Sequence, residues 1–204
     1  EEGGKNGYVK LPTGFGKTVL FTEFIEALDM RTLIVVPTKL LITQTEAKIK
    51  KFASGLETGK IYQRAKEFGR QVTIITYDSL IAQLKNGNLN PDDYDCVILD
   101  EVHEALGNAS RNAVGQFTKG IKIGFTATPD YSEEKGVKDL LETEIHHMNI
   151  REGVESGHLA SFANVLVRTE ADISKVKDVG GEFDEGELEK AVNIESRNQV
   201  VIRM

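Results

Sequence analysis

Cysteine is almost absent from this 204-residue sequence, and no apolar run approaches the ~18 residues that would cross a membrane. The single cysteine, Cys96, excludes an internal disulfide and a cysteine-rich metal site. The first residues, Glu1 to Gly4, lack the basic start and apolar centre of a signal peptide. We therefore expect a cytoplasmic protein in a reducing setting, with no membrane partner.

Basic residues are outnumbered by acidic ones, 25 against 32, and the net charge is −7. Residues 1–129 carry 16 basic against 15 acidic side chains, whereas residues 130–190 carry 7 against 16. The acidity is thus confined to the last third and does not exclude a polyanionic partner for the first part. Four lysines there indicate either a weak basic patch or a solvated helix face: Lys39, Lys48, Lys50 and Lys51.

Apolar segments of strand length alternate with helical segments over most of the chain. Strands are predicted at 7–11, 31–36, 71–76, 96–99 and 121–125, and helices at 17–29, 39–52, 78–85 and 108–117. Continuous apolar runs are typical of parallel strands covered on both faces. The alternation predicts an α/β fold, a mostly parallel sheet with helices on both faces. The helix after Thr38 is expected to bury Leu40, Leu41, Ala47, Ile49 and Phe52.

Beyond Pro129 the sequence becomes polar and acidic, and its elements are shorter. A helical segment is expected near 137–141, a strand at 144–150, a helical turn at 151–157 and a strand at 162–169. Residues 54–59 and 175–186 are expected to be loops, and residues 187–204 a helix. We assign residues 1–150 to one lobe and residues 151–204 to a connection that leads into a second, incomplete lobe.

The segment from Leu11 to Thr18 reads Leu-Pro-Thr-Gly-Phe-Gly-Lys-Thr and joins the first strand to the first helix. A glycine-rich turn that closes with Gly-Lys-Thr is typical of a phosphate-binding loop, whose N–H groups and following helix attract an anion. Lys17 is predicted to reach the terminal phosphates, and Thr18 to hold Mg²⁺. The pattern normally has glycine where Leu11 stands, so a chance glycine-rich turn is the alternative.

Two adjacent carboxylates, Asp100 and Glu101, follow the fourth strand. The aspartate is predicted to hold Mg²⁺, and the glutamate to act as general base on an attacking water. The alternative is a pair of carboxylates that cap a helix. Since ligands collect at the carboxyl ends of parallel strands, we expect Pro37-Thr38, Thr126-Ala127-Thr128 and the carboxylates to share the edge of the phosphate loop.

Four short motifs stand in the order found in superfamily-two helicases: Leu11–Thr18, Val36–Leu41, Asp100–His103 and Phe125–Pro129. Over residues 7–130 the sequence resembles the N-terminal RecA-like lobe of the DExH-type helicases and translocases in that group, where leucine at position 11 is tolerated. A Gly-x-Leu sequence at 157–159 makes it most similar to restriction-enzyme motor subunits and phage-type helicases.

The resemblance implies a nucleic-acid-stimulated ATPase that uses ATP and Mg²⁺ and moves on DNA in preference to RNA. The implied catalytic residues are Glu101, Asp100 and Lys17, with Thr18 and Asp100 as metal ligands. The implied ATP-binding residues are Pro12, Thr13, Gly14, Phe15, Gly16, Lys17 and Thr18. Coupling of the ATP site to the polymer is implied for His103, Thr126 and Thr128. Contact with the nucleic-acid backbone is implied for Pro37, Thr38 and Thr76.

Two parts of such motors are not in this sequence: an upstream glutamine segment that reads adenine, and a second RecA-like lobe with arginine fingers. Arginine fingers contribute ~10³–10⁵ in rate in related NTPases, so we expect the 204-residue chain to be a weak ATPase. The implied partners are that second lobe, nucleic acid, and a nuclease or restriction subunit.

Two alternatives are a nucleotide-gated nucleic-acid-binding module without unwinding and a non-motor P-loop NTPase such as a kinase. The kinase leaves Pro37-Thr38 and Thr126-Ala127-Thr128 unexplained, whereas the module shares every residue named above. The remaining histidines, His146, His147 and His158, are expected to be solvated or partly buried, and His158 has no partner signal.

Overall fold

The computed structural model describes residues 6–63, 65–127, 130–132, 135–161, 172–179 and 182–193. Contacts divide the chain into two compact units, Glu1–Ala160 and Ser161–Met204. The helical turn predicted at 151–157 is helix α5 (Ile150–Glu155), which belongs to the first unit. That the second unit begins a second lobe stays a prediction.

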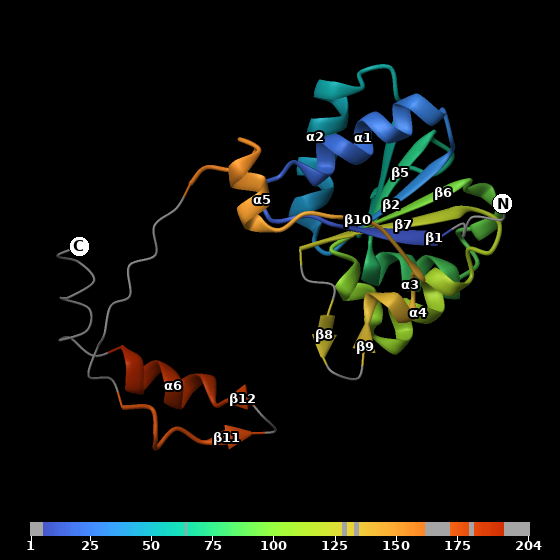
Figure 1. Ribbon diagram of the computed structural model, residues 1–204. Coiled ribbons are helices and arrows are strands. Elements are labelled where there is room, and N and C mark those ends of the chain that lie inside the picture. Colours follow the sequence, from blue (N-terminus) through green and yellow to red (C-terminus); the bar gives the residue numbers. More distant parts are fainter. Residues whose placement is uncertain are drawn as a thin grey trace. The chain divides into compact units, whose positions relative to one another are not determined.

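The first unit is built on an eight-stranded sheet with the strand order β10-β1-β7-β6-β2-β5-β3-β4 (Figure 1). All neighbouring strands are parallel except β3 and β4. The strands are β1 (Asn6–Lys10), β2 (Thr32–Val36), β3 (Thr58–Tyr62), β4 (Ala65–Lys66), β5 (Val72–Thr76), β6 (Cys96–Asp100), β7 (Ile121–Thr126) and β10 (Thr143–His147). The predicted mostly parallel α/β sheet is therefore confirmed.

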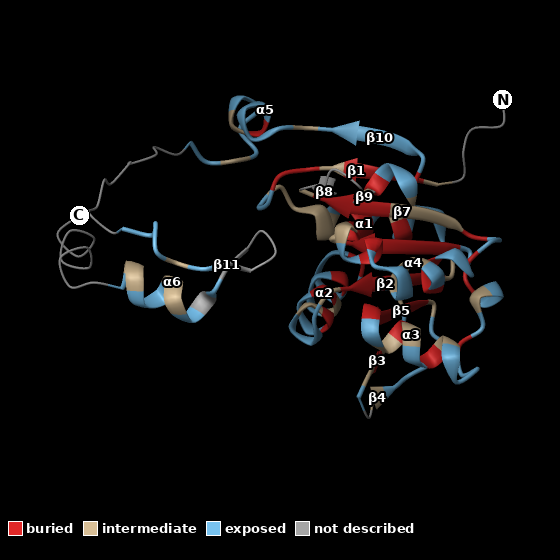
Figure 2. Ribbon diagram, turned by 90° about the horizontal axis from the view of Figure 1, so that it is seen from below, coloured by how far each residue is buried: buried red, intermediate tan, exposed pale blue. Residues whose placement is uncertain are grey.

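Helices cover both faces of the sheet, with α1 (Lys17–Leu28) and α2 (Lys39–Phe52) on one side and α3 (Tyr77–Lys85) and α4 (Asn108–Gly115) on the other (Figure 1). The buried side chains accordingly form two clusters, one that includes Phe21 and Ile42 and one that includes Leu80 and Phe117. Successive side chains of a strand point to opposite faces of the sheet. In β2, the fully buried Val35 therefore belongs to the cluster with Leu80, and the fully buried Val36 to the cluster with Phe21. The central strands appear as a buried layer in Figure 2.

Three core positions predicted in α2 are wrong, because Leu40 is 67% exposed, Phe52 is 43% exposed and Ala47 is exposed as well. The buried side of α2 carries Ile42, Thr45 and Ile49 instead. A helix turns by about 100° per residue, so Leu40 and Ala47, each two residues from a buried position, point to the opposite side, whereas Phe52 is exposed at the last position of the helix. Leu41 is half-buried and Ile49 buried, as expected.

The strand β3 was not predicted, since residues 54–59 were expected to be a loop. Its sequence, Thr-Gly-Lys-Ile-Tyr, is largely polar, and only Gly59 and Ile61 are buried. A Cβ at Gly59 would collide with the backbone oxygen of Glu67, so the strand requires glycine there. An alternation this weak in apolar residues does not distinguish a strand next to the sheet edge from a loop.

Among the shorter elements of the first unit, the helical segment near 137–141 and the strand at 144–150 were predicted, the latter being β10. The segment near 137–141 is a 3₁₀ turn, η3 (Val137–Asp139), and two others are η1 (Pro91–Asp93) and η2 (Val102–Leu106). Strands β8 (Asp130–Ser132) and β9 (Lys135–Gly136) form a separate pair. The elements η1, η2, β8 and β9 were not predicted.

The second unit contains β11 (Asp178–Val179) paired with β12 (Glu182–Phe183), followed by helix α6 (Glu185–Val192). The loop predicted over 175–186 therefore holds two short strands, and the last helix begins earlier than expected. The strand predicted at 162–169, and the helix beyond Asn193, lie outside the described residues.

Candidate functional site

Five parallel strands of the first unit end beside residues that the sequence singled out. The phosphate loop follows β1, Pro37 and Thr38 follow β2, and Thr76 ends β5. Asp100 ends β6 and Thr126 ends β7. Because these strands are parallel, their carboxyl ends meet at one edge of the sheet, and the structure brings the groups together there.

The phosphate loop takes its shape from two glycines in the left-handed region, Gly14 with φ of 88° and Gly16 with φ of 95°. Gly16 is the N-cap of α1 and has no side chain to cap the helix, so backbone N–H groups of its first turn point toward the loop. The concave backbone and the positive end of the helix together suit an anion.

Leu11 does not take part in the phosphate loop. Its side chain is 1% exposed in the cluster that contains Phe21, and its amide donates to the carbonyl of Thr126 at 3.0 Å. The residue therefore extends β1 into the core, and the loop itself begins at Pro12.

Lys17 and Glu101 form an ion pair at this edge, with 2.9 Å between Nζ and Oε1. Apart from this contact with Glu101, the Lys17 ammonium is shielded from solvent and has no hydrogen-bond partner within the part of the chain that the structure describes. A buried ammonium with unused donors, next to a loop of backbone N–H groups, fits a bound phosphate. Glu101 itself has φ of 46°, an uncommon conformation for a residue other than glycine.

The side chain of Asp100 is 6% exposed, and its Oδ1 accepts from the Glu101 amide at 3.2 Å. Burial raises the pKa of this carboxyl above its ordinary value, and the neighbouring Glu101 charge adds to the rise, while Lys17 opposes it. Tyr77 donates to the Asp100 carbonyl oxygen at 3.1 Å. A carboxylate whose charged form is disfavoured in this way would gain from a bound cation.

The hydroxyl of Thr18 accepts a hydrogen bond of 3.2 Å from Lys48 of α2. The charge of Lys48 also acts on Asp100, where it lowers the pKa of the carboxyl. Hard oxygen ligands from a hydroxyl and a carboxylate fit Mg²⁺, which usually keeps waters and phosphate oxygens as its other ligands. Among the described residues no group of three or more His, Cys, Asp and Glu could hold a metal alone, so Thr18 and Asp100 would be partial ligands.

His103 lies between the carboxylates and β7. Its Nδ1 is 3.0 Å from the Thr126 hydroxyl and 3.6 Å from Oε2 of Glu101. Thr126 is fully buried, so the contact joins the catalytic candidate to the end of a core strand. The other residue assigned to coupling, Thr128, lies outside the described residues.

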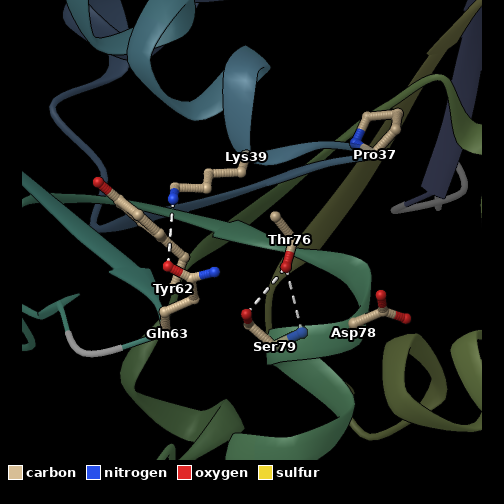
Figure 3. A pocket seen from close by; sticks show the side chains of 7 residues that line it. All are labelled: Pro37, Lys39, Tyr62, Gln63, Thr76, Asp78 and Ser79. Carbon is tan, nitrogen blue, oxygen red and sulfur yellow. Dashed lines mark hydrogen bonds between the residues drawn. The ribbon is translucent and has the colours of Figure 1, made fainter.

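Pro37 and Thr76 line one pocket of about 290 Å³, together with Lys39, Tyr62, Gln63, Asp78 and Ser79 (Figure 3). The Thr76 hydroxyl donates to Ser79 and accepts from its amide, so Thr76 also caps α3. Thr38 caps α2 by accepting from the Leu41 amide.

Two residues of this pocket, Tyr62 and Gln63, could not be predicted from the sequence, because they lie at and just after the end of β3, a strand that was not predicted. Lys39 donates to Gln63 at 3.1 Å, and its ammonium lies 5.3 Å from the centre of the Tyr62 ring. The sequence indicates Lys39 only as part of a weak basic patch or of a solvated helix face.

The histidines divide into two cases. His146 and His147 are exposed neighbours on β10, as expected. His158 is exposed as well, as expected, but nothing in the sequence indicated its partner, since its ring packs against Phe15 of the phosphate loop with 5.0 Å between the ring centres. Only the tertiary structure brings these distant residues together.

The family described as "Type III restriction enzyme, res subunit" matches residues 1–131. The chain is 27% identical to the putative ATP-dependent helicase IRC3 of Saccharomyces cerevisiae, over 99% of this chain and 32% of that protein. It is 34% identical to the DNA 3'-5' translocase XPB2 of Sulfurisphaera tokodaii, over 64% of this chain and 29% of that protein. It thus spans about a third of these curated relatives.

Among solved structures, a hypothetical ATP-dependent RNA helicase from Sulfolobus tokodaii superposes with a TM-score of 0.61 at 21% identity. The match covers 70% of this chain and 48% of that one. This likeness confirms the predicted RecA-like lobe as a fold. No helix among the described residues is both long and apolar enough to span a membrane.

Proposed function

The chain belongs to the family described as the type III restriction enzyme res subunit, and on that premise we propose that it is the ATP-binding lobe of a nucleic-acid motor. The family confirms the resemblance to superfamily-two helicases and restriction-enzyme motor subunits. The observation that carries the proposal is the meeting of Lys17, Thr18, Asp100 and Glu101 at one sheet edge. The proposed activity is ATP hydrolysis coupled to movement on DNA, less so on RNA.

In this proposal the loop from Pro12 to Thr18 binds the phosphates of ATP. Its backbone N–H groups and the start of α1 face the anion, and Lys17 supplies an ammonium. Thr18 and Asp100 would hold Mg²⁺, which when bound neutralises negative charge on the phosphates. The raised pKa of Asp100 supports this, because a cation at that carboxylate would offset the cost of its burial.

Glu101 is the proposed general base. Its Oε1 is held by Lys17 at 2.9 Å, and its Oε2 lies 3.6 Å from His103. A phosphate that draws Lys17 toward itself would release one carboxylate oxygen of Glu101. That oxygen would then orient a water and accept its proton.

The nucleic acid is proposed to lie along the pocket edge of the sheet, at Pro37, Thr38 and Thr76. Backbone phosphate contacts of this kind are largely independent of sequence. His103 and Thr126, 3.0 Å apart, are proposed to link events at Glu101 to the neighbouring strand end, together with Thr128.

DNA is the preferred polymer in this proposal, and the name of the Sulfurisphaera relative, a DNA translocase, supports it. We also propose that residues 151–204 lead into a second RecA-like lobe, since the relatives are about three times as long as the matched part. A nuclease or restriction subunit is the proposed larger partner, which the family description supports.

Binding of a fluorescent ATP analogue by the 204-residue chain tests the ATP site. Lys17→Ala is expected to abolish binding, whereas Glu101→Gln should retain it because the phosphate loop is untouched. Lys119→Ala, at an exposed lysine paired with Asp92, is the matched control and should bind normally.

Hydrolysis is measured separately, with and without polynucleotide. The isolated chain is expected to turn over slowly, and robust stimulated turnover would contradict the need for a second lobe. In a longer form that carries such a lobe, Glu101→Gln is expected to lose stimulated hydrolysis. Near-normal turnover by that variant would show that Glu101 is not the base.

A further inference from the structure

The chain returns to the phosphate loop after β10. The amide of Met148 donates to the Lys10 carbonyl at 2.9 Å, and the Met148 side chain packs against the cluster that contains Phe21. Helix α5 then begins with a capping box, in which Asn149 accepts from the Glu152 amide and Glu152 accepts from the Asn149 amide. The start of α5 is therefore fixed to the end of β1, next to the loop.

The Gly-x-Leu sequence at the end of α5 has a clear structural role. Gly157 has φ of 76°, and the amides of His158 and Leu159 both donate to the Gly153 carbonyl, at 3.0 and 2.9 Å. This turn sends the chain back along its own helix. Leu159 then occupies the space beside Gly153, where a Cβ would lie 2.7 Å from the leucine side chain.

The two residues that follow Gly157, His158 and Leu159, both lie against the phosphate loop. The His158 ring lies 5.0 Å from the Phe15 ring with 32° between the ring planes, within the range of aromatic pairs. A Cβ built on Gly14 would lie 3.5 Å from Cδ2 of Leu159, so this leucine side chain lies next to the loop at Gly14. We name His158 and Leu159 the exit clamp.

The tip of the loop is held on one side, where the Phe15 amide donates to the Pro12 carbonyl at 3.3 Å and the Phe15 side chain packs against the cluster that contains Phe21. Phe15 stands between two glycines with positive φ, and glycine loses more conformational freedom on ordering than any other residue. Contacts from outside the loop must therefore select the conformation that presents its N–H groups. The exit clamp supplies such contacts at both Gly14 and Phe15.

We propose that His158 and Leu159 are positioning residues for the nucleotide site, which hold the phosphate loop in its binding conformation. The proposal rests on the proposed function, and it adds that nucleotide affinity depends on the segment through which the chain leaves the first unit. By thermodynamic reciprocity, bound nucleotide must then stabilise the exit clamp to the same degree.

The first test measures binding of N-methylanthraniloyl-ADP with Mg²⁺ to the 204-residue chain. His158→Ala is expected to weaken binding about three- to tenfold, because an aromatic pair of ordinary strength shifts a two-state equilibrium by that amount. His158→Phe keeps a ring on Phe15 and should restore the affinity. His146→Ala is the same substitution on the exposed strand β10 and should bind like the unaltered chain.

The outcomes separate this proposal from the proposed function. If the unaltered chain does not bind the probe, or if Lys17→Ala binds equally well, the proposed function falls and the clamp with it. If Lys17→Ala abolishes binding but His158→Ala and Leu159→Ala leave affinity unchanged, the ATP site stands and the clamp is wrong. If His158→Phe binds as weakly as His158→Ala, the ring contact is not what positions the loop.

The second test needs no substitution in the exit clamp itself. Amide hydrogen exchange at Gly157, His158 and Leu159 is followed in the unaltered chain with and without ADP and Mg²⁺. Reciprocity predicts slower exchange of these amides when nucleotide is bound, and no change in the Lys17→Ala chain. Exchange that is unaffected by saturating nucleotide in the unaltered chain would overturn the proposal.

Discussion

Replacement of Asp100 by asparagine should stabilise the folded chain while it removes a metal ligand. The carboxyl is 6% exposed, and burial, with the Glu101 charge, raises its pKa in the folded state. The folded chain therefore holds this proton more tightly than the unfolded chain. The destabilising effect is absent below the unfolded pKa, grows as the pH rises from the unfolded to the folded pKa, and is fully present above the folded pKa.

The gain in the free energy of unfolding comes from the removal of one disfavoured charge, at a site that already has hydrogen-bond partners. Lys17, Lys48 and the Glu101 amide offset part of the cost, so the gain for Asp100→Asn is about 0.5–2 kcal/mol, typical of a relieved functional site. For a chain of 204 residues that corresponds to a rise of about 1–8 °C in melting temperature.

The assay is thermal unfolding at neutral pH, with and without ADP and Mg²⁺. Asp100→Asn should melt higher than the unaltered chain when nucleotide and metal are absent, and should gain less from their addition. Asp92→Asn, at an exposed carboxylate, is the control and should change the free energy of unfolding by less than about 0.5 kcal/mol. A lower melting temperature for Asp100→Asn in metal-free buffer would refute the reasoning.

Two further predictions concern the loop backbone and the core thiol. Gly16→Ala should cost about 1–3 kcal/mol of stability and weaken nucleotide binding, because φ of 95° strains any other residue, whereas Gly55→Ala, in open space, should do neither in urea unfolding. Burial raises the pKa of the Cys96 thiol to about 12, so an aromatic disulfide reagent at pH 8 should react only in urea. Rapid reaction of the native chain would contradict the buried position of Cys96.

The sheet could be predicted because its central strands are buried on both faces and are apolar throughout. β2, β5 and β6 are buried at every position, and each was recognised from its run of apolar residues. β3 was missed because a strand next to the sheet edge needs little apolar surface, and only Ile61 of its larger side chains is fully buried. Whether a strand can be recognised from a single sequence therefore depends on how many of its side chains are buried.

The helix α2 shows a second limit. Its start at Thr38 and its length were predicted, since a cap and a helical segment are local features. Its buried side was not, because Leu40 and Phe52 are apolar and yet exposed at 67% and 43%. Which side of a helix is buried depends on where the sheet lies, and that is not a local property.

In the candidate site, too, the residues placed by local features could be predicted, and those placed by tertiary packing could not. The groups at strand ends could be placed together beforehand, because parallel strands end at a common edge and carry their following residues with them. Lys48 and His158 could not, although one donates to Thr18 and the other packs on Phe15. Both reach the site from helices or turns whose positions depend on tertiary packing.

Leu11 explains why the phosphate loop can depart from its usual pattern. The two positions that need glycine are Gly14 and Gly16, since they alone in the loop have positive φ. Leu11 has its amide bonded to Thr126 and its side chain 1% exposed in the core. Truncation of a buried leucine to alanine typically costs about 2–5 kcal/mol, so a glycine here would weaken the end of β1 from which the loop starts. The leucine therefore strengthens the support of the loop, while the loop keeps the two glycines on which its conformation depends.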